Sequence, residues 1–158
     1  MRLAVGDPAP AFALPDTAGR IVRRSDFAGR RLVLYFYPAD LTPGCTTEAC
    51  QFNDELTALR DLGADVVGVS PDPAARHREF IARYGLTFTL LSDVDRSVMR
   101  AYGAYGDKLL YGKTVTGVIR STFVVGPTGL LEHVWYGVRA TGHAARVRAA
   151  LAAPESAS

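Results

Sequence analysis

Residues 32–62 read LVLYFYPADLTPGCTTEACQFNDELTALRDL and join an apolar run to a helical pattern. The run at residues 32–37 is aromatic and aliphatic throughout, and its length suits a β-strand that is buried on both faces. Pro38 and the Pro43-Gly44 pair interrupt this pattern. The stretch therefore predicts a buried strand, a turn that contains two prolines, and then a helix.

The helix is predicted by an apolar stripe with successive spacings of four, three, four and three residues: Cys45, Ala49, Phe52, Leu56 and Leu59. Gly63 follows the stripe and suits the end of the helix. Cys45 then lies in the first turn, just beyond the end of a buried strand. Backbone N–H groups in a first turn lack intrahelical acceptors and the helix dipole favours negative charge, so this position favours a thiolate.

The position of Cys45 is also compatible with a small buried hydrophobe, which is what many free cysteines are. Its neighbours add further polar or reactive side chains: Thr42 three residues before it, Glu48 three residues after it, and Cys50 five residues after it. Thr42 could be the N-cap that precedes Pro43, and Glu48 could be a first-turn acid that complements the dipole. The residues alone leave these structural and chemical alternatives open.

The length of 158 residues suits one domain over residues 1–158, with a short tail at 153–158 that we expect to fray. The 48% apolar and 22% charged contents are those of a globular protein, and the net charge of +2 comes from scattered residues. We therefore expect no nucleic-acid partner. No apolar run approaches the roughly 20 residues of a membrane span, and the first residues lack the core of a signal peptide. A cytoplasmic location is the expectation, and two cysteines in a reducing compartment favour a redox or catalytic role.

The rest of the chain alternates strand and helix patterns. Proline-rich residues 1–16 predict an extended strap. The predicted strands are residues 20–23, 65–70, 87–91, 115–125 and 130–136, the predicted helices are 73–84, 95–102 and 141–151, and residues 103–112 are expected to form a glycine-rich loop. Gly126-Pro127-Thr128-Gly129 predicts a hairpin turn. This order indicates an α/β protein with a central mixed sheet flanked by helices.

Arg120 interrupts the otherwise apolar residues 118–125. It could face solvent, or it could lie near Cys45. An ordinary thiol needs roughly 3–4 kcal/mol of differential stabilisation to become mostly thiolate at neutral pH, and a helix N-terminus supplies at most about 1–2 kcal/mol. A nearby cation must supply the rest, and Arg120 is the best candidate.

Metal and nucleotide signatures are weak in this sequence. The three histidines, His77, His133 and His143, match no Cys/His ligand spacing, so no structural metal is expected. No glycine-rich phosphate loop follows a strand in dinucleotide-binding form.

Several segments together resemble the active-site pattern of peroxiredoxins, and more narrowly that of the bacterioferritin comigratory, or peroxiredoxin Q, subfamily. They are Tyr37-Pro38, Thr42-Pro43-Gly44-Cys45-Thr46, Glu48-Ala49-Cys50-Gln51-Phe52 and Gly117-Val118-Ile119-Arg120-Ser121-Thr122-Phe123. The resemblance covers roughly residues 3–152 and implies a thioredoxin-like fold with an N-terminal extension. Ala39, Asp40 and Asn53 depart from basic residues that many relatives carry, which bears on the choice of reductant.

The resemblance implies a thiol-dependent peroxidase of antioxidant defence that acts on hydrogen peroxide and organic hydroperoxides. Cys45 would be the peroxidatic nucleophile that becomes a sulfenic acid, and Cys50 the resolving cysteine that forms an intramolecular disulfide with it. The remaining roles are a peroxide-binding Arg120, a hydrogen bond from Thr42 to peroxide oxygen, a shielding Pro38, and Glu48 as the residue that orients Arg120. A thioredoxin-like or glutaredoxin-like dithiol would reduce the disulfide, with no metal, haem or flavin. We expect a monomer or weak homodimer with no membrane partner.

Two other functions fit the same fold. A disulfide reductase would normally carry Cys-x-x-Cys and a proline before the later strand, whereas this chain has Cys-x-x-x-x-Cys and no proline over residues 113–125. A copper-binding chaperone would pair its cysteines with a histidine from a loop. Insulin reduction without peroxidase turnover would favour the reductase, and metal analysis would test the chaperone.

Overall fold

The computed structural model describes residues 2–153 and centres on a five-stranded mixed sheet. The strand order is β5-β4-β3-β8-β9, from Thr89–Ser92, Ala64–Ser70, Arg31–Phe36, Ser121–Val125 and Leu131–Tyr136. β3 pairs in parallel with β4, and β4 with β5, while β8 and β9 are antiparallel to their neighbours. This is the thioredoxin-like architecture that the sequence predicted.

The central strand β3 is buried because helices or loops cover both of its faces. Every residue from Leu32 to Phe36 has an exposed fraction of 0%. Successive side chains of a strand point to opposite faces, and here Val33 and Tyr35 join one hydrophobic cluster while Leu32, Leu34 and Phe36 join the other. The apolar run therefore supplies both halves of the core.

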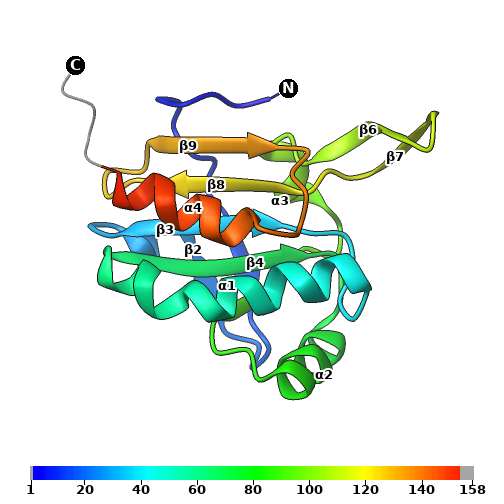
Figure 1. Cartoon of the computed structure of the whole chain (residues 1–158), viewed down its shortest axis with the longest axis horizontal. Coiled ribbons are helices and arrows are strands. Elements are labelled where there is room, and N and C mark those ends of the chain that lie inside the picture. The colour runs from blue at the N-terminus through cyan, green and yellow to red at the C-terminus, as the bar shows by residue number, and fades with distance from the viewer. Residues whose placement is uncertain (1, 154–158) are drawn as a thin grey trace.

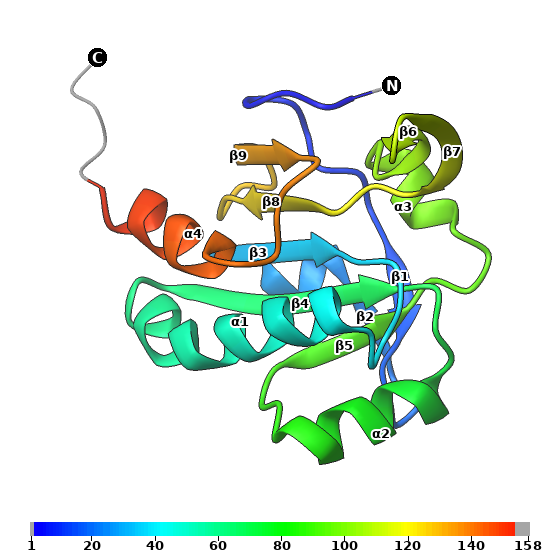
Figure 2. The same cartoon turned by 45° about the vertical axis from the view of Figure 1, so that its right-hand side comes forward.

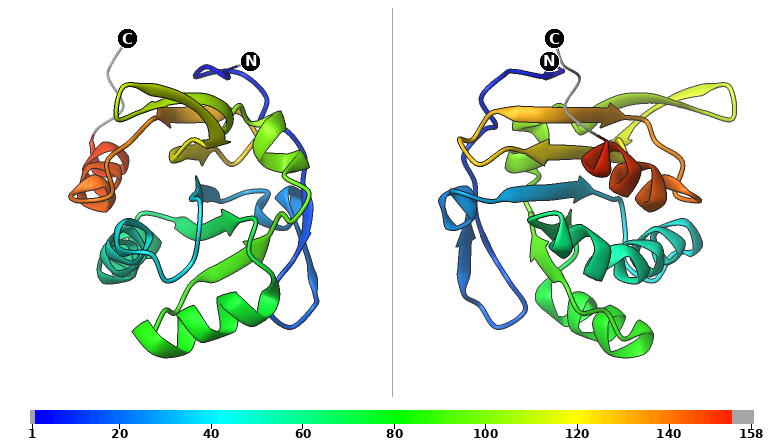
Figure 3. Two further views of the ribbon diagram at one scale, coloured as in Figure 1. Left: turned by 90° about the vertical axis from the view of Figure 1, so that its right-hand side faces the viewer. Right: turned by 60° about the vertical axis from the view of Figure 1, so that its left-hand side comes forward.

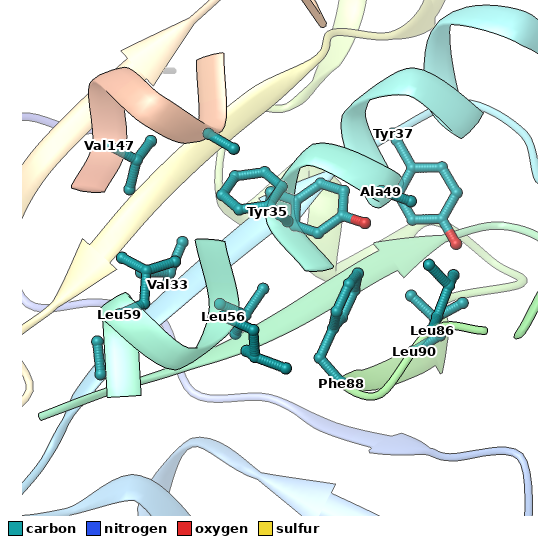
Figure 4. Close-up of a cluster of buried hydrophobic side chains, with 14 of the residues drawn as sticks. Val33, Tyr35, Tyr37, Ala49, Leu56, Leu59, Leu86, Phe88, Leu90 and Val147 are labelled. Carbon is teal, nitrogen blue, oxygen red and sulfur yellow. The ribbon is translucent and has the colours of Figure 1, made fainter. Parts of the chain in front are cut away.

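One face of the sheet is covered by α1 (Pro43–Asp61) and α4 (His143–Ala152), as Figures 1 and 3 show. Figure 4 shows part of this cluster, in which the Tyr35 ring lies between residues of α1 and the sheet. All five residues of the predicted stripe on α1 are buried. Gly63, just past the helix, takes a positive φ of 79°, which agrees with its predicted stop role.

The other face is covered by the N-terminal segment and by α3 (Ser97–Ala101), which Figure 3 shows opposite α1 and α4. The N-terminal segment contains a small hairpin, β1 (Ala13–Pro15) with β2 (Ile21–Arg23), and the short 3-10 helix η1 (Arg24–Phe27) follows it. α2 (Ala74–Tyr84) lies beside β5 at the sheet edge (Figure 2). Its N-cap is Pro73, the first residue of the helix predicted over 73–84.

The prediction of a glycine-rich loop over residues 103–112 is wrong. A second hairpin pairs β6 (Tyr105–Leu110) with β7 (Lys113–Val118) and projects from the body in Figure 1. Its two-residue turn has positive φ at both Tyr111 (52°) and Gly112 (77°), the backbone that suits the twist of hairpin strands. Tyrosine is uncommon in that conformation, so the turn signal was weak in the sequence.

The prediction of a single strand over residues 115–125 is also wrong, because the chain breaks between β7 and β8 at Ile119 and Arg120. The Ile119 N–H donates to the Ala104 carbonyl at 2.7 Å, and the Arg120 carbonyl accepts from the Val138 N–H at 3.0 Å. These bonds satisfy the backbone outside the sheet and fix the place of Arg120.

The domain prediction of 1–158 stays a prediction, and of its tail at 153–158 only Ala153 belongs to the described residues. None of the helices within residues 2–153 is long and apolar enough to cross a membrane.

Candidate active site

Cys45 lies in the first turn of α1, and its side chain is almost fully buried, with 1% exposed. Thr42 is the N-cap residue and Pro43 is the first helical residue. Proline has no N–H, so the free donors of this turn belong to the residues after it. The sulfur therefore lies at the positive end of the helix dipole.

Arg120, which lies between β7 and β8, contacts Cys45 at the start of α1 directly. Its Nη2 donates to Cys45 Sγ at 3.3 Å, although the two residues are 75 positions apart. Gly44 leaves room for this approach, since a Cβ at that position would lie 3.3 Å from Arg120 Nη2 and the guanidinium would have to shift by a few tenths of an ångström. The predicted partnership of this cation with Cys45 is thus present in the geometry.

Glu48 holds the other end of the guanidinium. Its Oε1 accepts from Arg120 Nη1 at 2.6 Å, and the carboxylate is fully buried whereas Arg120 keeps 17% of its side chain exposed. Burial raises the pKa of Glu48 to about 7, even though the charge and hydrogen bond of Arg120 act in the opposite direction. Burial alone would lower the pKa of Arg120, but Glu48 and Cys45 more than offset it and leave that pKa raised.

Glu48 Oε2 and the Tyr35 hydroxyl are buried without a hydrogen-bond partner among the described residues. Burial, followed by the charge of Glu48, raises the pKa of Tyr35 well above its ordinary range, so this phenol stays neutral. Tyr35 stacks on Phe52 of α1 with ring centroids 4.6 Å apart. The floor of the site is therefore aromatic and uncharged apart from Glu48.

Thr42 does not cap α1 with its side chain, contrary to the structural alternative considered from the sequence. Its hydroxyl instead donates to the Ala39 carbonyl at 2.8 Å, within the turn that precedes the helix. A hydroxyl whose proton is engaged in this way can still accept a hydrogen bond. Thr42 is half-buried, as is Pro38, which follows the strand β3 by two residues.

Cys50 lies on the same helix as Cys45, and both are free thiols. It is half-buried, and burial together with the negative charge of Asp54 raises its pKa. A raised pKa keeps this group a thiol at neutral pH, which suits a resolving cysteine better than a first nucleophile.

A cluster of three buried polar side chains beside the site was not predicted from the sequence. Tyr37, Asp40 and His77 are all fully buried and hydrogen-bonded to one another. The available signal was that His77 precedes Phe80 by three residues and so shares the inward face of its helix. Within residues 2–153 no group of three or more His, Cys, Asp or Glu side chains forms a metal-binding cluster.

The fold and the site together define a class: a thioredoxin-fold protein with a buried cysteine at a helix N-terminus, contacted by an arginine that is hydrogen-bonded to a buried glutamate. Residues 5–134 match the AhpC/TSA family. A protein of Mycobacterium tuberculosis is 54% identical over 147 residues, which cover 93% of this chain and 94% of that protein. Peroxiredoxin Bcp of Escherichia coli is 41% identical over 141 residues, with 89% and 90% covered.

Solved structures agree with these sequence matches. Xanthomonas campestris peroxiredoxin Q has a TM-score of 0.83 at 42% identity, with 89% of each chain covered. A cysteine-to-serine mutant of Xylella fastidiosa PrxQ has a TM-score of 0.88 at 36% identity, with 96% of each chain covered. The chain belongs to the AhpC/TSA family and is a peroxiredoxin of the bacterioferritin comigratory, or peroxiredoxin Q, type, a thiol-dependent peroxidase.

Proposed function

We propose that this peroxidase reduces hydrogen peroxide and organic hydroperoxides with Cys45 as the nucleophile, in antioxidant defence. The observation that carries the proposal is the 3.3 Å contact of Cys45 Sγ with Arg120 Nη2 at the start of α1. A related Xanthomonas campestris bacterioferritin comigratory protein, 41% identical, is described with alkyl peroxide reduction activity. That description supports an organic hydroperoxide as one substrate here.

The first chemical step breaks the peroxide O–O bond. The Cys45 thiolate attacks one oxygen, the sulfur is oxidised to sulfenic acid, and the other oxygen leaves as an alkoxide or hydroxide that takes up a proton. Arg120 and the N–H groups of the first turn of α1 offset the negative charge that moves from sulfur to the leaving oxygen. Because the Thr42 hydroxyl donates to Ala39, its oxygen is free to accept the O–H of the peroxide and orient it.

Glu48 and Pro38 act less directly in this scheme. Glu48 fixes one guanidinium nitrogen of Arg120 so that the other nitrogen points at the sulfur. Pro38 brings an apolar, half-buried ring to the turn before α1, which would limit water around the thiolate.

The second step forms a disulfide, in which the Cys50 thiol displaces water from the Cys45 sulfenic acid. A thioredoxin-like or glutaredoxin-like dithiol then reduces this disulfide by exchange and is itself oxidised. Residues five apart on an α-helix have Cα atoms separated by about 8.7 Å, whereas a disulfide rarely spans more than about 7 Å. Since both cysteines lie on the continuous helix α1, the first turns of α1 must unwind before the bond can form.

The stopped-flow reaction of reduced protein with hydrogen peroxide and with an organic hydroperoxide tests the proposal, with Trp135 as the single tryptophan reporter. Cys45→Ser should abolish peroxide consumption, and retained turnover would contradict the assignment. Cys50→Ser is the matched control, since it should react once, stall as sulfenic acid and then over-oxidise.

Unwinding is tested by hydrogen exchange and mass spectrometry of the oxidised protein. Amide exchange should rise over about residues 43–54 when Cys45 and Cys50 are joined. An intermolecular disulfide, or a protected helix beside an intramolecular one, would be incompatible with the proposed cycle.

A further inference from the structure

A fully buried polar cluster made of Tyr37, Asp40 and His77 lies between the end of β3 and α2. The Tyr37 hydroxyl donates to Asp40 Oδ1 at 2.5 Å, and His77 Nδ1 lies 2.5 Å from Asp40 Oδ2. None of the three side chains has exposed surface. Burying polar groups costs free energy unless they are hydrogen-bonded, so each polar atom of this cluster needs a hydrogen-bond partner in the folded protein.

The hydrogen bonds fix the number of protons in the cluster. His77 Nε2 faces the Leu91 carbonyl at 3.0 Å, and a carbonyl only accepts, so Nε2 carries a hydrogen. One further proton then lies between His77 Nδ1 and Asp40 Oδ2. With that proton in place, every buried polar atom of the Asp40 and His77 side chains has a hydrogen-bond partner.

The backbone of Asp40 is tied to the same side of the molecule. Its N–H donates to Asp72 Oδ2 at 2.7 Å, and its carbonyl accepts from Arg76 Nη2 at 3.1 Å. Asp72 is itself held by the Ser70 hydroxyl at 2.8 Å. Side chain and backbone together therefore fasten Asp40 to the end of β4 and to α2.

Asp40 is the middle of the short turn that carries the proposed peroxide-binding groups. Pro38 precedes it by two residues, Thr42 follows it by two, and the Thr42 hydroxyl bonds back across it to Ala39. Leu41 has a φ of 66°, a left-handed conformation that is strained for a non-glycine residue. Surrounding contacts must hold such a residue: Leu41 packs against the hydrophobic cluster that contains Cys45, and the backbone of the preceding Asp40 is fixed by its own hydrogen bonds.

We infer that Asp40 and His77 are positioning residues for the peroxide reaction, which hold the turn so that the Thr42 hydroxyl and the start of α1 are preset around Cys45. The inference deepens the proposed function and rests on it. Asp40 acts through Thr42 and the helix start, so its loss should slow the reaction with peroxide, which needs a bound and oriented substrate. It should not slow simple alkylation of the same sulfur, which needs no peroxide pocket.

Four variants test this: Asp40→Ala, Asp40→Asn, Tyr37→Phe and, as a matched control, Asp93→Ala. Asp93 is another buried carboxylate, and its side chain accepts hydrogen bonds from the Val98 and Met99 N–H groups of α3 instead of from residues of the turn. For each reduced protein, the second-order rate constants with hydrogen peroxide and with iodoacetamide are measured at one pH, and their ratio is compared with wild type. Circular dichroism and thermal melting report folding.

Asp40→Ala should lower the peroxide rate constant by about tenfold or more, because small misplacements of oriented groups are that costly. Its iodoacetamide rate constant should stay within about twofold, since the thiolate and Arg120 remain. Asp40→Asn should restore most of the ratio, because its amide can donate to His77 Nδ1 while its oxygen accepts from Tyr37. Asp93→Ala should lose stability with an unchanged ratio, as expected for a purely structural carboxylate.

If Asp40→Ala fails to fold, the inference is tested with Tyr37→Phe, which removes only one hydroxyl. This variant should still lower the ratio of the peroxide rate constant to the iodoacetamide rate constant. A folded Asp40→Ala or Tyr37→Phe variant with the wild-type ratio would overturn the role of Asp40. The role of Asp40 would also be overturned if Asp40→Asn lowered the ratio of the two rate constants as much as Asp40→Ala does. A wild-type protein that reacts with peroxide no faster than free cysteine would refute the proposed function instead, which keeps the two failures distinct.

Discussion

The buried carboxylate of Glu48 gives the free energy of unfolding a pH dependence that can be isolated by mutation. Its pKa is about 7 in the folded protein against an ordinary value of 4.5. Between these values the folded protein binds more protons than the unfolded chain, so the free energy of unfolding falls as the pH rises through this window. Each unit of difference corresponds to about 1.4 kcal/mol.

From pH 5 to pH 8 this single group should therefore lower the free energy of unfolding by about 2–3 kcal/mol. Glu48→Gln removes the titration and keeps the shape, so the free energy of the variant should lack that part of the pH dependence. Urea unfolding of both proteins at several pH values measures the difference. Cys45→Ser is used as the background for both, which removes titration of the sulfur without touching the causes of the Glu48 shift, namely burial and Arg120.

The free energy of unfolding of the Glu48→Gln variant, minus that of its parent, should rise by about 2–3 kcal/mol as the pH rises from 5 to 8. Most of this change should be complete just above pH 7. A difference between the two proteins that does not change with pH would refute the reasoning. It would mean that pairing with Arg120 compensates for burial and that the carboxylate ionises at its ordinary pH.

Three further predictions concern the contacts of Arg120, Gly44 and Gly68. Arg120→Met should slow the peroxide reaction by about tenfold or more, since the charge-assisted contact with Cys45 Sγ is worth roughly 1.5–3 kcal/mol; an unchanged rate constant would exclude this partnership. Gly44→Ala should leave the free energy of unfolding unchanged or higher, because alanine has the higher helix propensity. It should slow the peroxide reaction, because the new Cβ would lie 3.3 Å from Arg120 Nη2; a rate equal to that of wild type would show that the guanidinium adjusts freely. Gly68→Ala should lower the free energy of unfolding by about 1–3 kcal/mol, since its Cβ would lie 2.9 Å from the Tyr35 ring; urea unfolding checks this, and an undisturbed midpoint would contradict it.

Much of the site could be predicted because its parts lie in one continuous segment. Thr42, Cys45, Glu48 and Cys50 are spaced on a single strand-turn-helix unit, and helical periodicity alone determines which of them share a face. The apolar stripe predicted α1 correctly, and the aromatic run predicted the fully buried strand β3. Local pattern suffices where the hydrophobic period is strong.

The second hairpin shows where local pattern fails. Residues 103–112 contain three glycines and suggested a loop, yet β6 and β7 pair through a turn that places Tyr111 at positive φ. The energetic preference for that turn comes from the pairing of the flanking strands and not from the turn residues themselves. Propensity gave the wrong answer because the decisive contacts are between residues on different strands.

Local pattern along the chain was enough to predict the α/β class, the helix that presents Cys45, and Arg120 as a candidate partner of that cysteine. The packing of separate elements was needed to show that Arg120 lies outside the strands, between β7 and β8, and reaches Cys45, and that Asp40 and His77 form one buried pair. Spacing along a chain specifies neighbours within a helix or strand, because those geometries repeat. Contacts across 75 or 37 positions depend on how separate elements pack, and burial within that packing raises the pKa of Glu48.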